Sequence, residues 1–138
     1  MESIYRYINV AANKQRRWFA SHSSLEKLSG AKEKILHYLL THQEEAVYQK
    51  MIEEEFGLRP PTATQLLKSM EDDGLIIKKA RDGDARFKVL TVTPEGEKHQ
   101  DQLESKMQEL TQTLIQDIPT EDLEIWSRVM QKIIKNLE

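Results

Sequence analysis

The chain has 138 residues, no cysteine and a formal net charge of −3. Its length allows one substantial core, and 38% hydrophobic with 31% charged residues is typical of a folded protein rather than a disordered one. The lack of cysteine excludes disulfides and cysteine nucleophiles. No apolar run approaches the roughly 18 residues that span a bilayer, and the first residues lack a secretion signal. We therefore expect a cytoplasmic protein with no membrane partner.

The net charge conceals two basic stretches. Residues 1–34 contain seven basic and three acidic residues, and residues 59–90 contain seven basic and five acidic ones. The remaining segments are acidic. Because screening limits the reach of a surface charge to about 8 Å, a local basic patch can attract a polyanion whatever the mean charge is. The acidic mean therefore does not exclude a nucleic-acid partner.

The first half of the chain predicts four helices. Apolar residues spaced by three and four predict a long helix over 3–27. A second helix is expected after Ser29, which suits its N-cap, and a third over 47–56, where Gly57 suits the C-cap. A fourth helix, over 60–73, starts with two prolines, which the first turn of a helix tolerates.

A hairpin and two more helices are expected after Gly74. The β-prone segments 75–77 and 87–92 flank a polar stretch that contains Asp-Gly, which favours a tight turn. Thr93-Pro94 is typical of a helix start, and that helix is predicted to run to Ile118. A last helix is expected from Thr120 to the end of the chain.

This order of elements predicts a mostly α fold, a winged helix-turn-helix with a two-stranded β-wing plus an N- and C-terminal helical dimerisation region. The outer helices each carry an apolar stripe that a small winged core cannot cover, so we expect them to pair in a two-fold homodimer. The predicted layout is a dimerisation helix over 1–28, a DNA-binding lobe over 29–96 and two dimerisation helices over 97–138.

The fourth predicted helix has an apolar and a polar face. Ala63, Leu66, Leu67 and Met70 form the apolar face. The other side carries the polar residues Thr62, Thr64, Gln65 and Lys68. Hydroxyls, an amide and a lysine are the groups that read base edges and hold phosphates in a major groove. The alternative is an ordinary solvated helix face.

The predicted hairpin is strongly basic. It carries Lys78, Lys79, Arg81, Arg86 and Lys88. Asp84, two residues before Arg86, can hold the guanidinium at the angle that an arginine in a narrow minor groove requires. The alternative is a solvated turn with a weak surface ion pair.

Three short motifs resemble those of the MarR family of transcriptional regulators. Asp84-Ala85-Arg86, followed by Val92-Thr93 and by Gly96, resembles the family's wing signature, with valine in place of leucine. Residues 70–76, Met-Glu-Asp-Asp-Gly-Leu-Ile, are similar to the end of its recognition helix. Leu28-Ser29 resembles the Leu-Thr that opens its second helix.

The resemblance implies a homodimer on a pseudo-palindromic double-stranded operator. The fourth helix would enter a major groove, and the wing would place Arg86 in the adjacent minor groove with Asp84 orienting it. The chain departs from the family at Arg59-Pro60-Pro61, where two amides are lost and the charge of Arg59 would restore a phosphate contact. The expected DNA-binding residues are Arg59, Thr62, Thr64, Gln65, Lys68, Lys79, Arg81, Asp84, Arg86 and Lys88.

The resemblance also implies a response to an effector. Oxidant sensing by cysteine is excluded, and His22, His37, His42 and His99 lack the paired spacing of metal ligands, so no metal is expected. An unidentified small aromatic effector would bind an aromatic-lined pocket. Its expected residues are Trp18, His22, His37 and Tyr38, for which ordinary core packing is the alternative.

The leading hypothesis is therefore a sequence-specific DNA-binding transcriptional regulator, expected to be a repressor. The alternative is a winged-helix protein-interaction module without DNA binding, suggested by the acidic run Glu53-Glu54-Glu55. No enzymatic activity is expected, because the sequence has neither a Gly-rich phosphate loop nor a nucleophile elbow.

Overall fold

The computed structural model describes residues 3–22, 28–81 and 83–138, and of residues 81 and 84–86 it describes the backbone alone. The predicted helical segment 23–27 therefore lies outside the described residues. The chain divides into two compact units, Met1–Ser105 and Lys106–Glu138. The two units are defined by compactness alone. The boundaries expected at residues 28 and 96 separate functional parts of the chain, so they stay predictions. In the described ranges, no helix has both the length and the apolar character that crossing a membrane demands.

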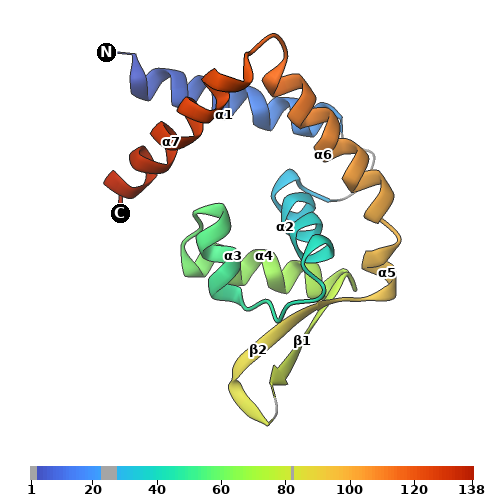
Figure 1. Cartoon of the computed structure of the whole chain (residues 1–138). Coiled ribbons are helices and arrows are strands. Elements are labelled where there is room, and N and C mark those ends of the chain that lie inside the picture. Colours follow the sequence, from blue (N-terminus) through green and yellow to red (C-terminus); the bar gives the residue numbers. More distant parts are fainter. Residues whose placement is uncertain (1–2, 23–27, 82) are drawn as a thin grey trace. The chain divides into compact units, whose positions relative to one another are not determined.

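Two helices open the first unit and meet at a glycine. Helix α1 covers Ile4–Ser21 and α2 covers Gly30–Thr41 (Figure 1). The predicted cap is confirmed, because the Ser29 hydroxyl accepts a hydrogen bond from the Lys32 amide at 3.4 Å. A Cβ at Gly30 would lie 3.1 Å from Cδ1 of Phe19, so the glycine lets this buried ring approach the start of α2.

The helix-turn-helix follows. Helix α3 covers Gln49–Phe56 and α4 covers Pro60–Asp72, and Gly57 between them has a φ of 61°, which favours glycine. The third helix starts two residues later than predicted because Val47 pairs with the hairpin instead. The Val47 carbonyl accepts a hydrogen bond from the Leu90 amide at 2.8 Å.

The hairpin is longer than the apolar pattern predicts. Strands β1, Ile76–Arg81, and β2, Asp84–Val92, pair antiparallel with Ile76 opposite Val92. The turn contains Gly83 at a φ of 82°, as expected for an Asp-Gly turn. The outer half of the ribbon carries charged residues, so the apolar pattern did not predict strands there. Strands form nevertheless, because backbone pairing does not need apolar side chains.

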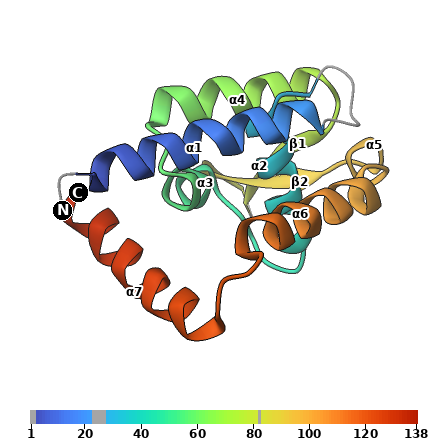
Figure 2. The same ribbon diagram turned by 90° about the horizontal axis from the view of Figure 1, so that it is seen from above.

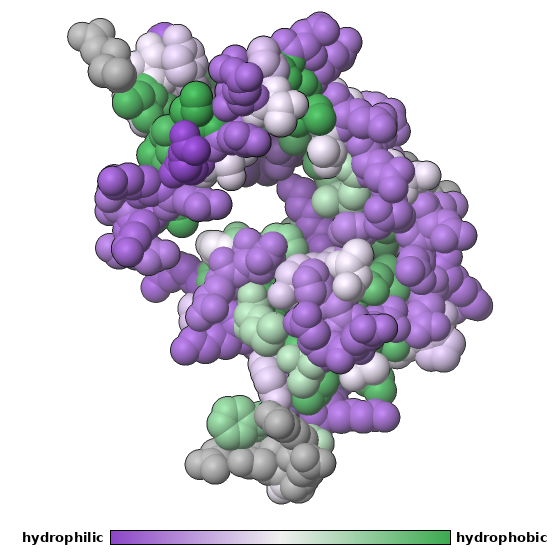
Figure 3. Space-filling model, viewed as in Figure 1, coloured by the Kyte–Doolittle hydropathy of each residue, from purple (hydrophilic) through white to green (hydrophobic). Residues whose placement is uncertain are grey.

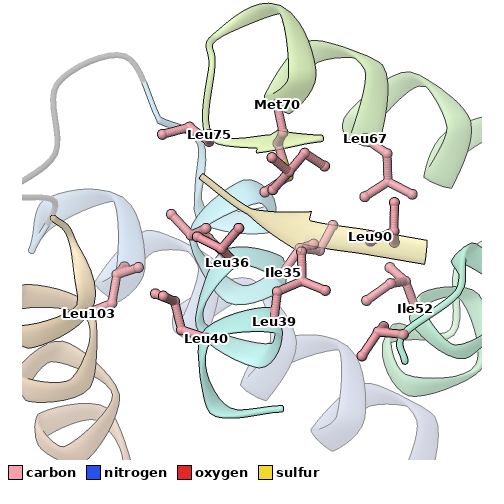
Figure 4. Packing of buried hydrophobic residues seen from close by; sticks show 13 residues of the cluster. Ile35, Leu36, Leu39, Leu40, Ile52, Leu67, Met70, Leu75, Leu90 and Leu103 are labelled. Carbon is pink, nitrogen blue, oxygen red and sulfur yellow. The ribbon is translucent and has the colours of Figure 1, made fainter. Parts of the chain in front are cut away.

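The core lies where α2, α3, α4 and the ribbon meet (Figure 4). Ile35 and Leu36 from α2, Ile52 from α3, and Leu67 and Met70 from α4 are all buried. Side chains from the ribbon and from the later helix close the cluster, namely Leu75, Ile76, Leu90, Val92 and Leu103. This shared core holds α4 and the ribbon in one rigid lobe.

The long helix predicted from Pro94 to Ile118 is instead two helices. Helix α5 covers Pro94–Glu97 and α6 covers Gln100–Ile115. The Thr93 hydroxyl caps α5 by accepting from the Gly96 amide at 3.1 Å, and it donates to the Gly74 carbonyl at 2.6 Å. The apolar periodicity of the sequence resumes after the break between α5 and α6, so the sequence pattern does not predict this break.

The last helices expose apolar side chains. Helix α7 covers Thr120–Asn136, and a short connector joins it to α6, from which it diverges (Figure 2). No described residue of α7 is buried. Its exposed apolar residues are Ile125, Trp126, Val129 and Ile134, followed by Leu137. Exposed apolar side chains also lie on α1, namely Ile4, Tyr5, Tyr7 and Val10, and Figure 3 shows apolar surface among hydrophilic residues.

Candidate nucleic-acid interface

The outer face of α4 is polar and exposed, as the sequence predicts. Ala63, Leu67 and Met70 are fully buried against the lobe, and Leu66 is half-buried. The opposite face exposes the four predicted contact residues, Thr62, Thr64, Gln65 and Lys68. The lobe therefore presents hydroxyl, amide and ammonium groups along one side of a helix whose other side is anchored.

The first turn of α4 has few amide donors. Arg59 occupies the N-cap in an extended conformation and makes no side-chain cap bond. Pro60 and Pro61 have no N–H, which leaves the amides of Arg59 and Thr62 as the donors at this end of the helix. Arg59 is exposed. The usual attraction of a helix N-terminus for phosphate is thus weakened, and a nearby cationic side chain is available to replace it.

Gln49, at the start of α3, is a site residue that sequence reasoning missed. Its amide nitrogen lies 2.9 Å from Oγ1 of Thr64, 3.1 Å from a carboxylate oxygen of Glu53 and 3.5 Å from the carbonyl oxygen of Pro60. The bond to Thr64 links two residues 15 apart in sequence and depends on how α3 packs on α4. No local motif could have revealed it.

The acidic end of α4 is partly neutralised by lysines. Nζ of Lys32 lies 3.7 Å from Asp73 and donates to the Ser69 hydroxyl. Nζ of Lys78 in β1 lies 3.9 Å from a carboxylate oxygen of Glu71. Lys78 therefore faces a carboxylate, whereas Lys79 and Lys88 on the same ribbon are exposed.

A basic hollow of about 360 Å³ lies between the start of α3 and the ribbon. It is lined by Tyr48, Gln49, Lys50, Lys78, Phe87, Lys88 and Leu90. The Tyr48 and Phe87 rings meet edge to face, 6.2 Å apart. Gln49 thus contacts α4 through Thr64 and lines the hollow beside Lys88. The outer face of α4 and the wing therefore meet on one surface.

The predicted pairing of Asp84 with Arg86 falls outside the described residues. The backbone of β2 runs through both positions, but their side chains and that of Arg81 are not described. The register changes between Ala80 and Arg81, so the strand pairing is irregular just before the turn. The role of Arg86 in a minor groove stays a prediction.

The four residues expected to line an effector pocket each have a described partner. Trp18 and His22 stack on each other at 4.0 Å along α1, and Tyr38 stacks on His42 along α2, also at 4.0 Å. Nε2 of His37 lies 2.8 Å from a carboxylate oxygen of Glu104. Trp18, His22 and Tyr38 thus have partners on their own helices and His37 has one on a later helix, and the effector pocket expected at these residues stays a prediction.

A cavity of about 400 Å³ lies instead on the neighbouring faces of α1 and α2. It is lined by Arg16, Phe19, Ala20, Gly30, Ala31, Lys34, Ile35, Phe56 and Leu58. Nζ of Lys34 sits 4.9 Å from the centre of the Phe19 ring. The cavity therefore combines two aromatic rings with two cationic side chains.

Tyr38 is close to this cavity, but the charged side chains near its phenol are acidic, whereas those that line the cavity are basic. Desolvation by burial raises the pKa of its phenol, and the carboxylates of Glu55 and Glu45 raise this pKa further. The phenol is therefore protonated at neutral pH.

Within the described residues, no group of three or more histidine or carboxylate side chains is arranged to hold a metal ion.

Comparison with known proteins agrees with this geometry. A MarR family model matches residues 34–86. An uncharacterised HTH-type transcriptional regulator of Bacillus subtilis, YwoH, is 28% identical over 87 residues, which are 63% of this chain and 63% of that relative.

Solved structures extend the likeness to nearly the whole chain. The transcription regulator MarR of Oenococcus oeni is 25% identical with a TM-score of 0.87, covering 96% of this chain and 98% of its own. Staphylococcus aureus MepR in its DNA complex has the same fold, with 21% identity, a TM-score of 0.85 and coverage of 96% and 97%.

The three-helix core with its β ribbon defines a winged helix-turn-helix protein, and the predicted fold class is confirmed. The resemblance seen in the short motifs is confirmed as well. The chain matches the MarR family by sequence in the winged lobe, over residues 34–86, and it has the fold of a MarR transcription regulator over nearly its whole length.

Proposed function

We propose that the chain is a cytoplasmic, sequence-specific regulator that binds double-stranded DNA at a pseudo-palindromic operator. The observation that carries this proposal is the shared surface of α4 and the wing. Exposed Gln65 and Lys68 lie on one element and Lys88 on the other, and Gln49 neighbours both elements. A helix for the major groove and a basic ribbon for the adjacent groove is the arrangement by which winged proteins read a duplex.

The relatives support this proposal over a protein-interaction module. YwoH is described as a transcriptional regulator, and MepR was solved bound to DNA. Within the acidic run Glu53–Glu55, Glu53 accepts a hydrogen bond from Gln49 inside the lobe, whereas Glu54 and Glu55 are exposed. The same relatives are regulators rather than enzymes.

We propose that the functional unit is a homodimer. The exposed apolar residues of α1 and α7 lie on helices outside the winged core, and a second copy of the chain would cover them. Two lobes in one dimer would read two half-sites, which explains why the operator is expected to be pseudo-palindromic. A dimer seated over a promoter would act as a repressor.

We propose further that a small aromatic acid is the effector. The cavity between α1 and α2 offers Phe19 and Phe56 for a ring and Arg16 and Lys34 for a carboxylate. Calorimetric titration with benzoate would show a heat of binding that Arg16→Ala removes. An unchanged heat in that variant would contradict this site.

The proposed function is tested by a gel-shift titration on the DNA upstream of the chain's own gene. Phosphate neutralisation supplies much of the affinity, so binding should fall about 10³-fold or more between 50 and 200 mM salt. A scrambled duplex of equal composition should bind far more weakly. Equal affinity for both duplexes would contradict sequence-specific binding.

A further inference from the structure

We infer that Gln49 is a positioning residue that sets the hydrogen-bond direction of Thr64 on the recognition helix α4. This inference rests on the proposed function, because it concerns which groups α4 offers to the DNA. The inference adds Gln49 of α3 to the predicted contact residues. Gln49 acts on the DNA contact only through Thr64.

The surroundings of Gln49 determine which end of its amide faces α4. Glu53 and Pro60 offer a carboxylate oxygen at 3.1 Å and a carbonyl oxygen at 3.5 Å, and neither can donate a hydrogen bond. The amide nitrogen must therefore face this cluster, since the amide oxygen would meet two acceptors. The contact of 2.9 Å to Thr64 is then a bond that Gln49 donates and Thr64 accepts.

Thr64 keeps its own hydroxyl hydrogen as a result. A threonine in a helix often turns that hydrogen back to the carbonyl four residues earlier, which here is Pro60. That carbonyl already faces the Gln49 amide and, in a regular helix, the Thr64 amide. In the part of the chain that the structure describes, no acceptor takes the Thr64 hydroxyl hydrogen.

Thr64 therefore presents a donor on the outer face of α4, beside Gln65. Acceptors for such a donor in a duplex are guanine O6 and N7, adenine N7, thymine O4 and the phosphate oxygens. The amino group of cytosine, a donor, could use only the one lone pair of Oγ1 that the Gln49 bond leaves free. Gln49 thus limits what α4 reads without touching the DNA.

A double-mutant cycle tests this. The variants are Gln49→Met, which keeps the length of the side chain but removes its N–H groups, Thr64→Val, and the pair together. Affinities are measured by gel shift on the duplex that the wild-type protein enriches most from a randomised pool. Each single variant should bind about fivefold more weakly, which is the loss of one neutral hydrogen bond. The double variant should bind no more weakly than Thr64→Val.

The control pair combines Gln49→Met with Lys79→Gln on the wing, where the losses should multiply. Thermal unfolding shows whether each variant is folded, and Gln49→Leu, which is also neutral and lacks the N–H groups, replaces Gln49→Met if that variant does not fold. A second pool selection with Thr64→Val separates the two kinds of acceptor. Relaxed preference at one base pair indicates a base edge, and uniformly weaker binding indicates a phosphate.

If Gln49→Met weakens binding as much in the Thr64→Val protein as in wild type, Gln49 acts on the helix as a whole and the inference is overturned. If the wild-type protein enriches no sequence from the pool, it is the proposed function that fails, and the inference falls with it. The two failures are therefore distinguishable.

Discussion

Gln65 is the residue of α4 best placed to read a base. It is exposed on the second turn, and its amide can pair with the N6 and N7 edge of adenine through two hydrogen bonds. Such a pair contributes about 1–3 kcal/mol of discrimination between bases. Lys68, on the next turn, differs from Gln65 because its charge can bind a backbone phosphate whatever the base sequence is.

We predict that Gln65→Ala relaxes the preferred sequence at one position in each half-site. Overall affinity for the best duplex should fall roughly tenfold or more, with the salt dependence unchanged, because no charge is lost. Selection from a randomised pool measures the change. An unaltered preferred sequence would show that Gln65 does not contact a base.

Side-chain exposure on α4 was predictable from sequence because a helix repeats every 3.6 residues. That rule places Thr62, Thr64 and Lys68 outside and Leu67 inside. It cannot give contacts between elements. Gln49 was missed because its partner Thr64 lies on another helix, and the pairing of His37 with Glu104, 67 residues away, could not be read from the sequence for the same reason.

The junction between the ribbon and α5 depends on one glycine. A Cβ at Gly96 would lie 2.4 Å from the Leu75 carbonyl oxygen and 2.6 Å from Cγ1 of Val92. The first of these atoms belongs to the backbone and cannot yield easily. This close approach explains why the wing motif ends in glycine.

We predict that Gly96→Ala lowers the free energy of unfolding by about 1–3 kcal/mol, the usual cost of overpacking. Urea denaturation measures this loss. Gly83→Ala offers a comparison of a different kind, because no atom of the described residues beyond its chain neighbours lies within 4 Å of its Cβ position and its positive φ is unfavourable for alanine. Wild-type stability for Gly96→Ala would show that the junction has room.

At the level of elements, the order of helices and strands was predictable, but some of their ends were not. Turn and cap residues such as Ser29 and Gly57 predicted the right boundaries because their effects are local. The strands extend past their apolar residues, and the predicted helix after Pro94 breaks at residues 98–99. The strands extend because backbone pairing does not need apolar side chains, and the helix break was missed because the apolar periodicity resumes after it.

The whole molecule is proposed to act as a dimer through its outer helices. Trp126 is 60% exposed on α7, and large exposed aromatic residues are typical of interface centres. An acidic side chain at that position would be buried without a partner in a dimer, which is strongly unfavourable.

We predict that Trp126→Glu shifts the protein from dimer to monomer and weakens operator binding, because the two half-sites are then bound independently. Sedimentation velocity measures the change in mass. Gln131→Glu, which adds the same charge on the other side of α7, is the matched control and should stay dimeric. A dimer in both variants would contradict an interface at Trp126.

Hydroxyl-radical footprinting of the protein on its own upstream DNA, compared between wild type and Arg86→Ala, measures most directly whether α4 and the wing engage one duplex together. The wild-type protein should protect two symmetry-related half-sites, whose centres are about 10 bp or a multiple of this apart. Arg86→Ala should lose the outer minor-groove protection and bind roughly 10- to 100-fold more weakly. Its thermal stability should be unchanged. Equal affinity and an identical footprint for the variant would contradict the proposed mode of binding.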